Sequence, residues 1–184
     1  MHRQALLHQL AAHQPADTTE QAMLTQTIDF VTAQPDCFHR TLLIGHVTGS
    51  AWIVSRTPAA PAERQVVLLH HRKLDRWFQP GGHADGDPDV AAVALREAQE
   101  ETGLTSLRLA SLAVFDVDVH PIPARGTEPA HLHYDIRFLL EADPTEPFIE
   151  TAETKAVRWV NVGQIADLND SESILRMKRK TDNL

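Results

Sequence analysis

A glycine pair followed by a well-delimited helix, at residues 81–104, constrains the fold more than any other part of the sequence. Two consecutive glycines let a backbone approach another group closely. Asp87 and Pro88 are residue types preferred at the N-cap and at the first position of a helix. Gly103 is typical of the left-handed residue that ends a helix. The sequence therefore predicts a helix over residues 88–102 that begins directly after a glycine loop.

The last turns of this predicted helix carry three glutamates. Glu97, Glu100 and Glu101 stand at positions i, i+3 and i+4, so their carboxylates share one face, where like charges repel each other. Arg96 can neutralise only part of that charge, whereas a hard cation such as Mg²⁺ is held by carboxylate oxygens together with substrate phosphates. A solvated acidic helix face is the alternative interpretation. The glycine loop beside the acids favours a cation site.

Short apolar runs rich in Val, Ile, Leu and Trp predict strands after residue 40. In one of them Tyr134, Ile136 and Phe138 alternate with charged residues. This period of two is typical of a strand with one buried and one wet face, so Asp135 and Arg137 are expected in solvent. The predicted strands are residues 41–44, 51–55, 65–71, 107–119, 132–140 and 156–160.

Helices are predicted at both ends of the chain. Residues 2–13 form a short amphipathic segment, and a second helix follows the capping-box spacing of Asp17 and Glu20. A last helix over 171–180 contains the basic run 176–180, which is interpreted as a solvated face. A few helices and many strands without regular alternation indicate an α/β protein of the α+β kind, with a mixed sheet between helices.

Composition limits the class of protein. With 184 residues and 42% hydrophobic residues, the chain has the size of about one domain with a packed core. No apolar stretch approaches the roughly 20 residues of a membrane span, and a net charge of -8 argues against binding along a nucleic-acid backbone. The one cysteine, Cys37, cannot form an internal disulfide, and no secretion signal is evident. We therefore expect a cytoplasmic protein that binds neither membrane nor nucleic acid.

Residues 82–104 resemble the signature box of the Nudix hydrolases, which reads Gly-x5-Glu-x7-Arg-Glu-U-x-Glu-Glu-x-Gly-U, where U is aliphatic. One position departs from it, because Pro88 stands where the box has its first glutamate; the flanking Asp87 and Asp89 could substitute for it. The resemblance extends over residues 40–165. The box positions that match are Gly82, Arg96, Glu97, Ala98, Glu100, Glu101, Gly103 and Leu104.

The resemblance implies an α/β/α sandwich around a mixed β-sheet, with an N-terminal helical extension over residues 1–36 and the Nudix domain over 37–184. It also implies a metal-dependent hydrolase that cleaves the diphosphate linkage of a nucleoside diphosphate derivative, or of a related diphosphate, by attack of water. Mg²⁺ or Mn²⁺ would be the cofactor. Its implied ligands are Glu97, Glu100, Glu101 and the Gly81 carbonyl.

The other roles are assigned on the same basis. Glu97 or Glu101 would orient the water, with Glu150 and Glu153 as alternative bases from another loop. Arg96 is expected to anchor the glycine loop by pairing with a carboxylate rather than to touch phosphate. The residues expected to contact substrate are Trp77, Phe78, Gly82 and His83.

Other functions remain open at this point. A non-catalytic Nudix-like module that senses a nucleotide, and an enzyme like isopentenyl diphosphate isomerase, are the alternatives; the isomerases need a cysteine near the box, and Cys37 is not placed there. The sequence does not identify the substrate, and the helical extension could serve as the contact in a homodimer. Six histidines invite a zinc hypothesis, but no zinc motif accompanies them, which favours structural or solvent roles. They are His70, His71, His83, His120, His131 and His133.

Overall fold

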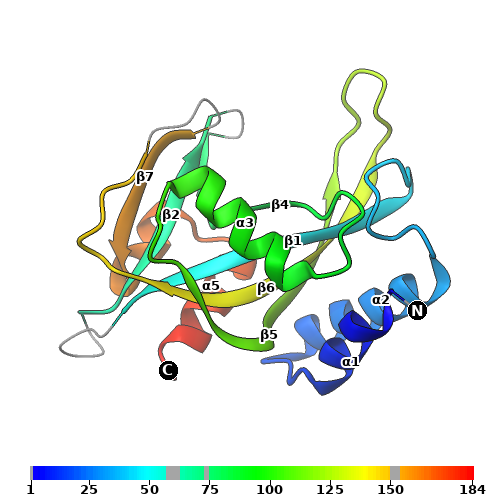
Figure 1. Cartoon of the computed structure of the whole chain (residues 1–184), viewed down its shortest axis with the longest axis horizontal. Coiled ribbons are helices and arrows are strands. Elements are labelled where there is room, and N and C mark those ends of the chain that lie inside the picture. The colour runs from blue at the N-terminus through cyan, green and yellow to red at the C-terminus, as the bar shows by residue number, and fades with distance from the viewer. Residues whose placement is uncertain (1, 57–62, 73–74, 150–153) are drawn as a thin grey trace.

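A mixed sheet built around β1 (Gly45–Ser55) forms the centre of the molecule (Figure 1). The computed structural model describes residues 2–56, 63–72, 75–149 and 154–184, and within them the sheet has seven strands. The order is β3-β2-β1-β6-β5, with β4 paired to β1 and β7 to β2. β1 runs parallel to β6 and antiparallel to β2 and β4. The other strands are β2 (Gln65–His71), β3 (Arg76–Phe78), β4 (Gly81–His83), β5 (Arg108–Ile122), β6 (His131–Ala142) and β7 (Thr154–Asn161).

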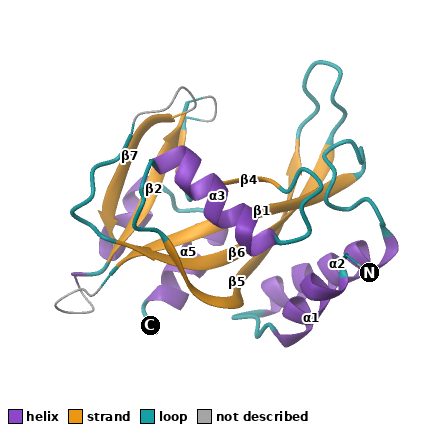
Figure 2. Ribbon diagram, viewed as in Figure 1, coloured by secondary structure: helices purple, strands orange, loops and turns teal. Residues whose placement is uncertain are grey.

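Helices cover both faces of this sheet (Figure 2). Val47 and Ile53 of β1 belong to the hydrophobic cluster that includes buried residues of α1, α2 and α3, whereas Trp52 packs with residues of α5. The fold is therefore the expected α/β/α sandwich. No helix among the described residues is both long and apolar enough to cross a bilayer. The helices are α1 (Gln4–Ala12), α2 (Thr18–Ala33), α3 (Val90–Thr102), α4 (Ile165–Leu168) and α5 (Glu172–Thr181), with a 3₁₀ turn, η2 (Val162–Gln164), before α4.

The helix α3 begins later than the sequence predicts. Asp89, not Asp87, is its N-cap, and the Asp89 carboxylate accepts a hydrogen bond from the Ala92 N–H at 3.1 Å. The Asp87 carboxylate instead accepts from the Asp89 N–H at 2.9 Å, a local turn that delays the first helical residue. The predicted end is confirmed, because Gly103 has a φ of 72°.

The start of β1 is the main difference from the predicted strands. Residues 41–44 are not a strand, and Leu43 and Ile44 are exposed, while the strand itself starts at Gly45 and continues through Gly49. A side chain at Gly49 would press on the Val90 carbonyl of α3 at 2.9 Å, so the glycine permits close helix packing rather than ending the strand.

The helical extension covers the edge of the sheet. Gln9 donates to the Leu112 carbonyl of β5 at 2.9 Å, and a ring nitrogen of His13 lies 3.0 Å from the Val114 carbonyl. Phe30 of α2 stacks on Tyr134 of β6, with ring centroids 3.8 Å apart. An edge strand presents unpaired backbone groups, and the Gln9 and His13 contacts occupy two carbonyls of the edge strand β5, while Phe30 packs on the neighbouring strand β6.

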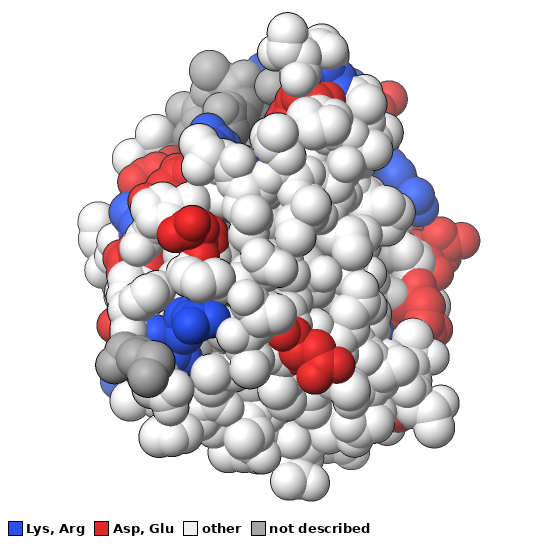
Figure 3. All heavy atoms as spheres, turned by 90° about the vertical axis from the view of Figure 1, so that its right-hand side faces the viewer, with Lys and Arg blue, Asp and Glu red and all other residues white. Residues whose placement is uncertain are grey.

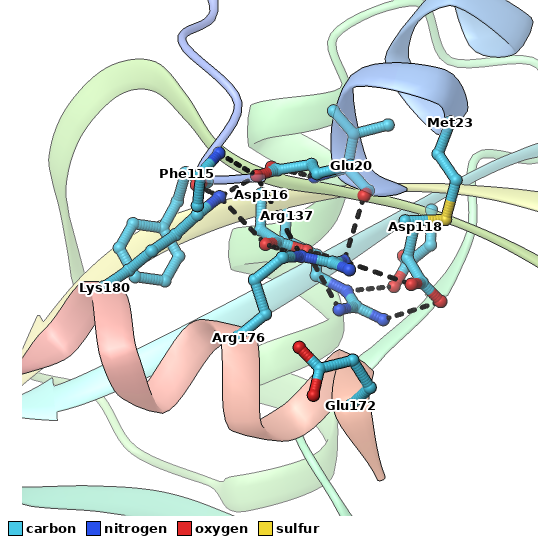
Figure 4. Close-up of polar contacts among 12 residues, drawn as sticks. Glu20, Met23, Phe115, Asp116, Asp118, Arg137, Glu172, Arg176 and Lys180 are labelled. Atoms are coloured by element: carbon cyan, nitrogen blue, oxygen red, sulfur yellow. Dashed lines mark hydrogen bonds and ion pairs between the residues drawn. The ribbon is translucent and has the colours of Figure 1, made fainter. Parts of the chain in front are cut away.

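A buried network of charged side chains joins α5 to the sheet (Figure 4). Arg176 is only 1% exposed, and its guanidinium donates to both carboxylate oxygens of Asp116 at 2.8 Å and to Asp118 at 3.1 Å. Arg137 of β6 lies 3.1 Å and 3.2 Å from the same two carboxylates. The solvated face predicted for residues 176–180 is therefore wrong for Arg176, because acids of β5 draw it into the interior.

Glu20 of α2 connects the helical extension to this network. It is fully buried, and its carboxylate accepts hydrogen bonds from Lys180 Nζ at 2.6 Å, from the Ala16 N–H at 2.6 Å and from the Val117 N–H at 3.1 Å. A His13 ring nitrogen lies 2.8 Å from it. The extension is thus held to both β5 and α5 by one carboxylate.

This carboxylate predicts acid sensitivity. Burial alone would raise the pKa of Glu20, but hydrogen bonds from His13, the Ala16 N–H and Lys180 outweigh it and lower the pKa from 4.5 to about 2. The charged form stabilises the fold above pH 4.5, and about 3 kcal/mol is lost as the pH falls from 4.5 to about 2. Urea denaturation across this range should show Glu20→Gln losing less stability than the wild type. Equal losses in the two proteins would contradict this role.

Candidate functional site

Two of the three glutamates of α3, Glu97 and Glu101, lie against the glycine pair of β4, and Glu100 lies on the same helix face toward solvent. The Gly81 N–H donates to the Glu101 carboxylate at 2.9 Å. A methyl group on Gly82 would overlap the Glu97 carboxylate, and one on Gly81 would overlap Ser50 of β1. The glycines are therefore needed because the acids and β1 approach the backbone of β4 from its two sides.

Arg96 ties the acidic helix to the glycine loop. It donates to Glu97 at 2.9 Å and to the His83 carbonyl at 3.3 Å, and its Nε lies 3.8 Å from Glu100. The hydrogen bond with Glu97 is the main cause that raises the pKa of Arg96. One guanidinium cannot balance the three carboxylates of Glu97, Glu100 and Glu101, so this face of α3 stays acidic. Arg96 thus has the anchoring geometry that the sequence predicts for it.

The donor set of this face fits a hard divalent cation. The Glu97 side chain is mostly buried beside the half-buried backbone of Gly82, while Glu100 extends into solvent. Carboxylate oxygens with backbone carbonyls and water are the ligands that Mg²⁺ and Mn²⁺ prefer.

The acids around Pro88 bond to backbone groups. Asp87 accepts from the Asp89 N–H, and Asp89 caps α3. Asp85 has a φ of 49° and lies 3.3 Å from Arg40. These bonds fix the loop locally; substitution of Asp87 or Asp89 for the box glutamate stays a prediction.

The residues predicted to contact substrate fall into two groups with different neighbours, one on β3 and one on β4. The Trp77 ring stacks on His70 at 4.9 Å between centroids, and the Arg158 guanidinium lies 4.1 Å from the Trp77 ring. Phe78, also on β3, pairs in register with Leu69 of β2 and is half-buried.

His83 has different neighbours. Arg40 donates to its Nδ1 at 2.6 Å, and its ring centroid lies 5.0 Å from that of His46. Gly82, which precedes it, touches Glu97 and thus belongs to the glutamate site. The alternative bases Glu150 and Glu153 fall outside the described residues.

A buried polar group beside Gly81 escaped the sequence analysis. Asp135 of β6 is 2% exposed and accepts hydrogen bonds from Ser50 Oγ at 2.7 Å, from Thr48 Oγ1 at 3.0 Å and from Arg137 Nε at 2.8 Å. The wet face predicted for Asp135 and Arg137 is wrong, because hydroxyl groups of β1 and acids of β5 satisfy them inside the protein. Opposite charges on neighbouring predicted strands are the signal that could have revealed it.

Histidines gather at the same end of the sheet. Four of the six that the sequence singles out lie in one cluster with His46 of β1, which it does not single out: three have rings near that of His46, and the fourth, His120, lies beside His133. Burial, with neighbouring histidines, lowers the pKa of His46 to about 4 and that of His133 to about 2, so both imidazoles are neutral at pH 7. His46 was missed because the first half of β1 was not predicted. The four others are His83, His120, His131 and His133.

Comparison with known proteins points to one family. The family profile described as "NUDIX domain" matches residues 53–180. A solved structure of C. elegans Ap4A hydrolase in a binary complex has a TM-score of 0.59 at 17% identity, covering 74% of this chain and 95% of that chain. At this identity the likeness shows the fold alone.

Curated relatives share more sequence. Over 125 residues the chain is 30% identical to the Mycobacterium tuberculosis protein named "Putative 8-oxo-dGTP diphosphatase 3", which covers 65% of this chain and 55% of the relative. Over 111 residues it is 31% identical to the Streptomyces rubellomurinus protein named "CMP-5'-(N-acetyl-N-hydroxy-3-aminopropyl)phosphonate hydrolase", covering 58% and 50%. The chain spans about half the length of the curated relatives it matches.

Proposed function

This chain belongs to the NUDIX domain family, and on that premise we propose that it is a metal-dependent hydrolase. Its substrate would be a nucleoside diphosphate derivative or a related diphosphate, cleaved at the diphosphate linkage by water. The observation that carries the proposal is the set of three glutamates on one face of α3, of which Glu97 and Glu101 contact the glycine pair of β4. The names of the relatives, a diphosphatase and a hydrolase, support the same reaction class.

Mg²⁺ or Mn²⁺ is the proposed cofactor. Glu97, Glu100, Glu101 and the Gly81 carbonyl would hold it. When bound, the ion would neutralise phosphate charge and lower the pKa of a water molecule. These ligands and this ion are proposals from the donor chemistry of the site.

The other proposed catalytic roles belong to side chains of this protein. Glu97 or Glu101 would orient the attacking water and take its proton, and each carboxylate is already held in place, Glu97 by Arg96 and Glu101 by the Gly81 N–H. Arg96 acts as a positioning residue. Gly82, His83, Trp77 and Phe78 remain the proposed substrate contacts.

The proposed partners follow from charge and fold. On the face that Figure 3 shows, lysine and arginine side chains are scattered rather than gathered into a basic patch. On this face, the charge distribution supports our proposal of a small-molecule diphosphate rather than nucleic acid as the partner. We propose that the protein is cytoplasmic. We also propose residues 1–36 as a helical extension to a domain over 37–184, with the extension available as a contact between two copies.

Substitution of Gly82 tests the packing of the site. Gly82→Ala is expected to lower kcat/KM about 100-fold, because the new methyl group displaces the Glu97 carboxylate. The control is Gly163→Ala, where a methyl group meets nothing within 4 Å. Steady-state kinetics and thermal melts of both variants check this. Wild-type kinetics for Gly82→Ala would contradict the assigned packing.

A product-resolved hydrolysis screen tests the function. Nucleotide sugars, dinucleoside polyphosphates, oxidised nucleoside triphosphates and coenzyme diphosphates would each be incubated with Mg²⁺ or Mn²⁺, and mononucleotide and phosphate would be quantified. We expect metal-dependent cleavage of at least one class. Binding without cleavage would favour a nucleotide-sensing module. The isomerase alternative needs a reactive thiol, whereas Cys37 is buried and burial raises its pKa to about 11.

A further inference from the structure

Three neighbouring strands bring histidines to one end of the sheet. His46 of β1 is in register with His133 of β6, and His133 is in register with His120 of β5. Ring centroids lie 4.8 Å apart for His46 and His133, 5.0 Å for His46 and His131, and 5.2 Å for His131 and His133. The three rings therefore lie together, and one nitrogen of each lies within 4.8 Å of a nitrogen of the other two.

His46 has unsatisfied polar atoms in this cluster. Its residue is 1% exposed, and neither ring nitrogen has a hydrogen bond of good geometry among the described residues; one ring N–H interacts only weakly with the Leu42 carbonyl. A buried polar atom without a partner costs free energy, and such atoms are rare in native proteins. A metal ion that accepts the lone pair of one ring nitrogen would satisfy that nitrogen, while the N–H of the other faces the Leu42 carbonyl.

His131 is oriented as a ligand would be. Its Nδ1 lies 2.9 Å from the Pro129 carbonyl, so Nδ1 carries the proton and donates it, and Nε2 presents its lone pair. Histidines that bind metals commonly donate their second ring N–H to a carbonyl or carboxylate in this way. His131 Nε2 lies 3.3 Å from His133 Nε2. Two ligands on a tetrahedral zinc with Zn–N bonds of about 2.0–2.1 Å stand about 3.3–3.4 Å apart.

We propose that His46, His131 and His133 form a three-histidine site for a divalent transition metal, with zinc as the ion. Their ligand nitrogens lie within 4.8 Å of one another. Imidazole nitrogen suits zinc, whereas the glutamates of α3 suit Mg²⁺ or Mn²⁺, so the two sets select different ions. The site does not depend on the proposed hydrolase activity.

His83 and His120 flank the site without entering it. The Arg40 guanidinium donates to His83 Nδ1, so the lone pair of Nδ1 is already used. The His83 proton is then on Nε2, which therefore has no lone pair for a metal. His120 Nδ1 lies 3.2 Å from Asp118, and the His120 ring centroid lies 5.5 Å from that of His133. Three protein ligands leave the fourth position of a tetrahedral zinc to water.

Metal titration of the full chain tests the site. Metal-depleted protein would be titrated with Co²⁺ in the presence of excess Mg²⁺, and Zn²⁺ would then be added. We expect one equivalent of Co²⁺ with the visible absorption of tetrahedral coordination, displaced by Zn²⁺. Absence of tight Co²⁺ and Zn²⁺ binding, which would leave only a hydrogen-bonded histidine cluster, overturns the proposal.

Variants locate the ion. His46→Gln and His133→Gln should each weaken Zn²⁺ binding more than about 100-fold. Loss of a residue that only hydrogen-bonds to a metal ligand weakens metal binding by about 10–100-fold, so a larger effect identifies a ligand. His8→Gln, at an exposed histidine of α1, and Glu97→Gln should bind Zn²⁺ like the wild type. Loss of Zn²⁺ binding in Glu97→Gln with retention in the histidine variants would overturn the site.

X-ray absorption of the zinc-loaded wild type decides the question even if a histidine variant does not fold. We expect three imidazole nitrogens at about 2.0–2.1 Å from zinc. A shell made only of oxygen would contradict the proposal. The two proposals are tested separately. Absence of zinc binding would not change the result expected from the hydrolysis screen, and absence of hydrolysis would not change the result expected from the zinc measurements.

Discussion

Glu97→Gln is expected to lower kcat/KM for diphosphate hydrolysis about 1,000-fold or more. The amide keeps the size of the side chain but removes a charged oxygen ligand, and an ion that stabilises transition-state charge contributes several kcal/mol, at 1.36 kcal/mol per tenfold in rate. Arg96 also loses the charge of its 2.9 Å partner. Kinetics at saturating Mg²⁺, with a thermal melt to show that the variant is folded, measure the effect.

The control for this prediction is the same acid-to-amide change at an exposed carboxylate outside the glutamate site. Asp29→Asn changes an exposed acid on α2 and should leave kcat/KM within about twofold, as expected of a surface charge remote from the site. Glu101→Gln should behave like Glu97→Gln, because Glu101 is fixed by the Gly81 N–H. Wild-type rates in both glutamate variants would exclude the α3 acids from the reaction.

Arg176→Leu is expected to destabilise the protein by about 3–5 kcal/mol. Removal of one partner from a buried ion network leaves the remaining charges unbalanced in a medium where they are poorly solvated. Asp116 would lose two hydrogen bonds and Asp118 one. Equilibrium urea unfolding at neutral pH measures the loss.

Arg179→Leu provides the matched control on the same helix. The Arg179 side chain is half-exposed and pairs with Glu172, a surface contact worth about 0–1 kcal/mol. A similar loss of stability for Arg176→Leu and Arg179→Leu would mean that the buried network does not hold α5 to the sheet.

Local signals account for what could be predicted. The cap of α2 at Asp17, the end of α3 at Gly103 and the shared face of Glu97 and Glu101 depend on residues within a few positions of each other. Short-range rules therefore found α1, α2, α3 and α5 but not the short helix α4. The glycine loop predicted at residues 81–83 is instead the short strand β4, because it pairs with β1, which lies more than 30 residues earlier in the sequence. The first turn of α3 differs by two residues because two aspartates competed to cap it.

Long-range pairing explains what was missed. The first half of β1 carries polar residues such as His46 and Ser50 that are buried because β6, more than 80 residues away in the sequence, supplies their neighbours. Asp135 and Arg137 follow the alternation of a strand with a wet face, yet hydroxyl groups of β1 bond Asp135, and acids of β5, which Arg176 of α5 also binds, pair with Arg137. A period of two identifies the two faces of a strand but does not show which elements cover each face.

Anomalous diffraction at the manganese edge tests the central claim most directly. Crystals would be soaked with Mn²⁺ and a non-hydrolysable analogue of a diphosphate that the screen identifies. We expect a manganese peak bound by oxygens of Glu97, Glu100 and Glu101, beside the diphosphate of the analogue. A bound analogue with these three side chains in solvent and no manganese among them would contradict it.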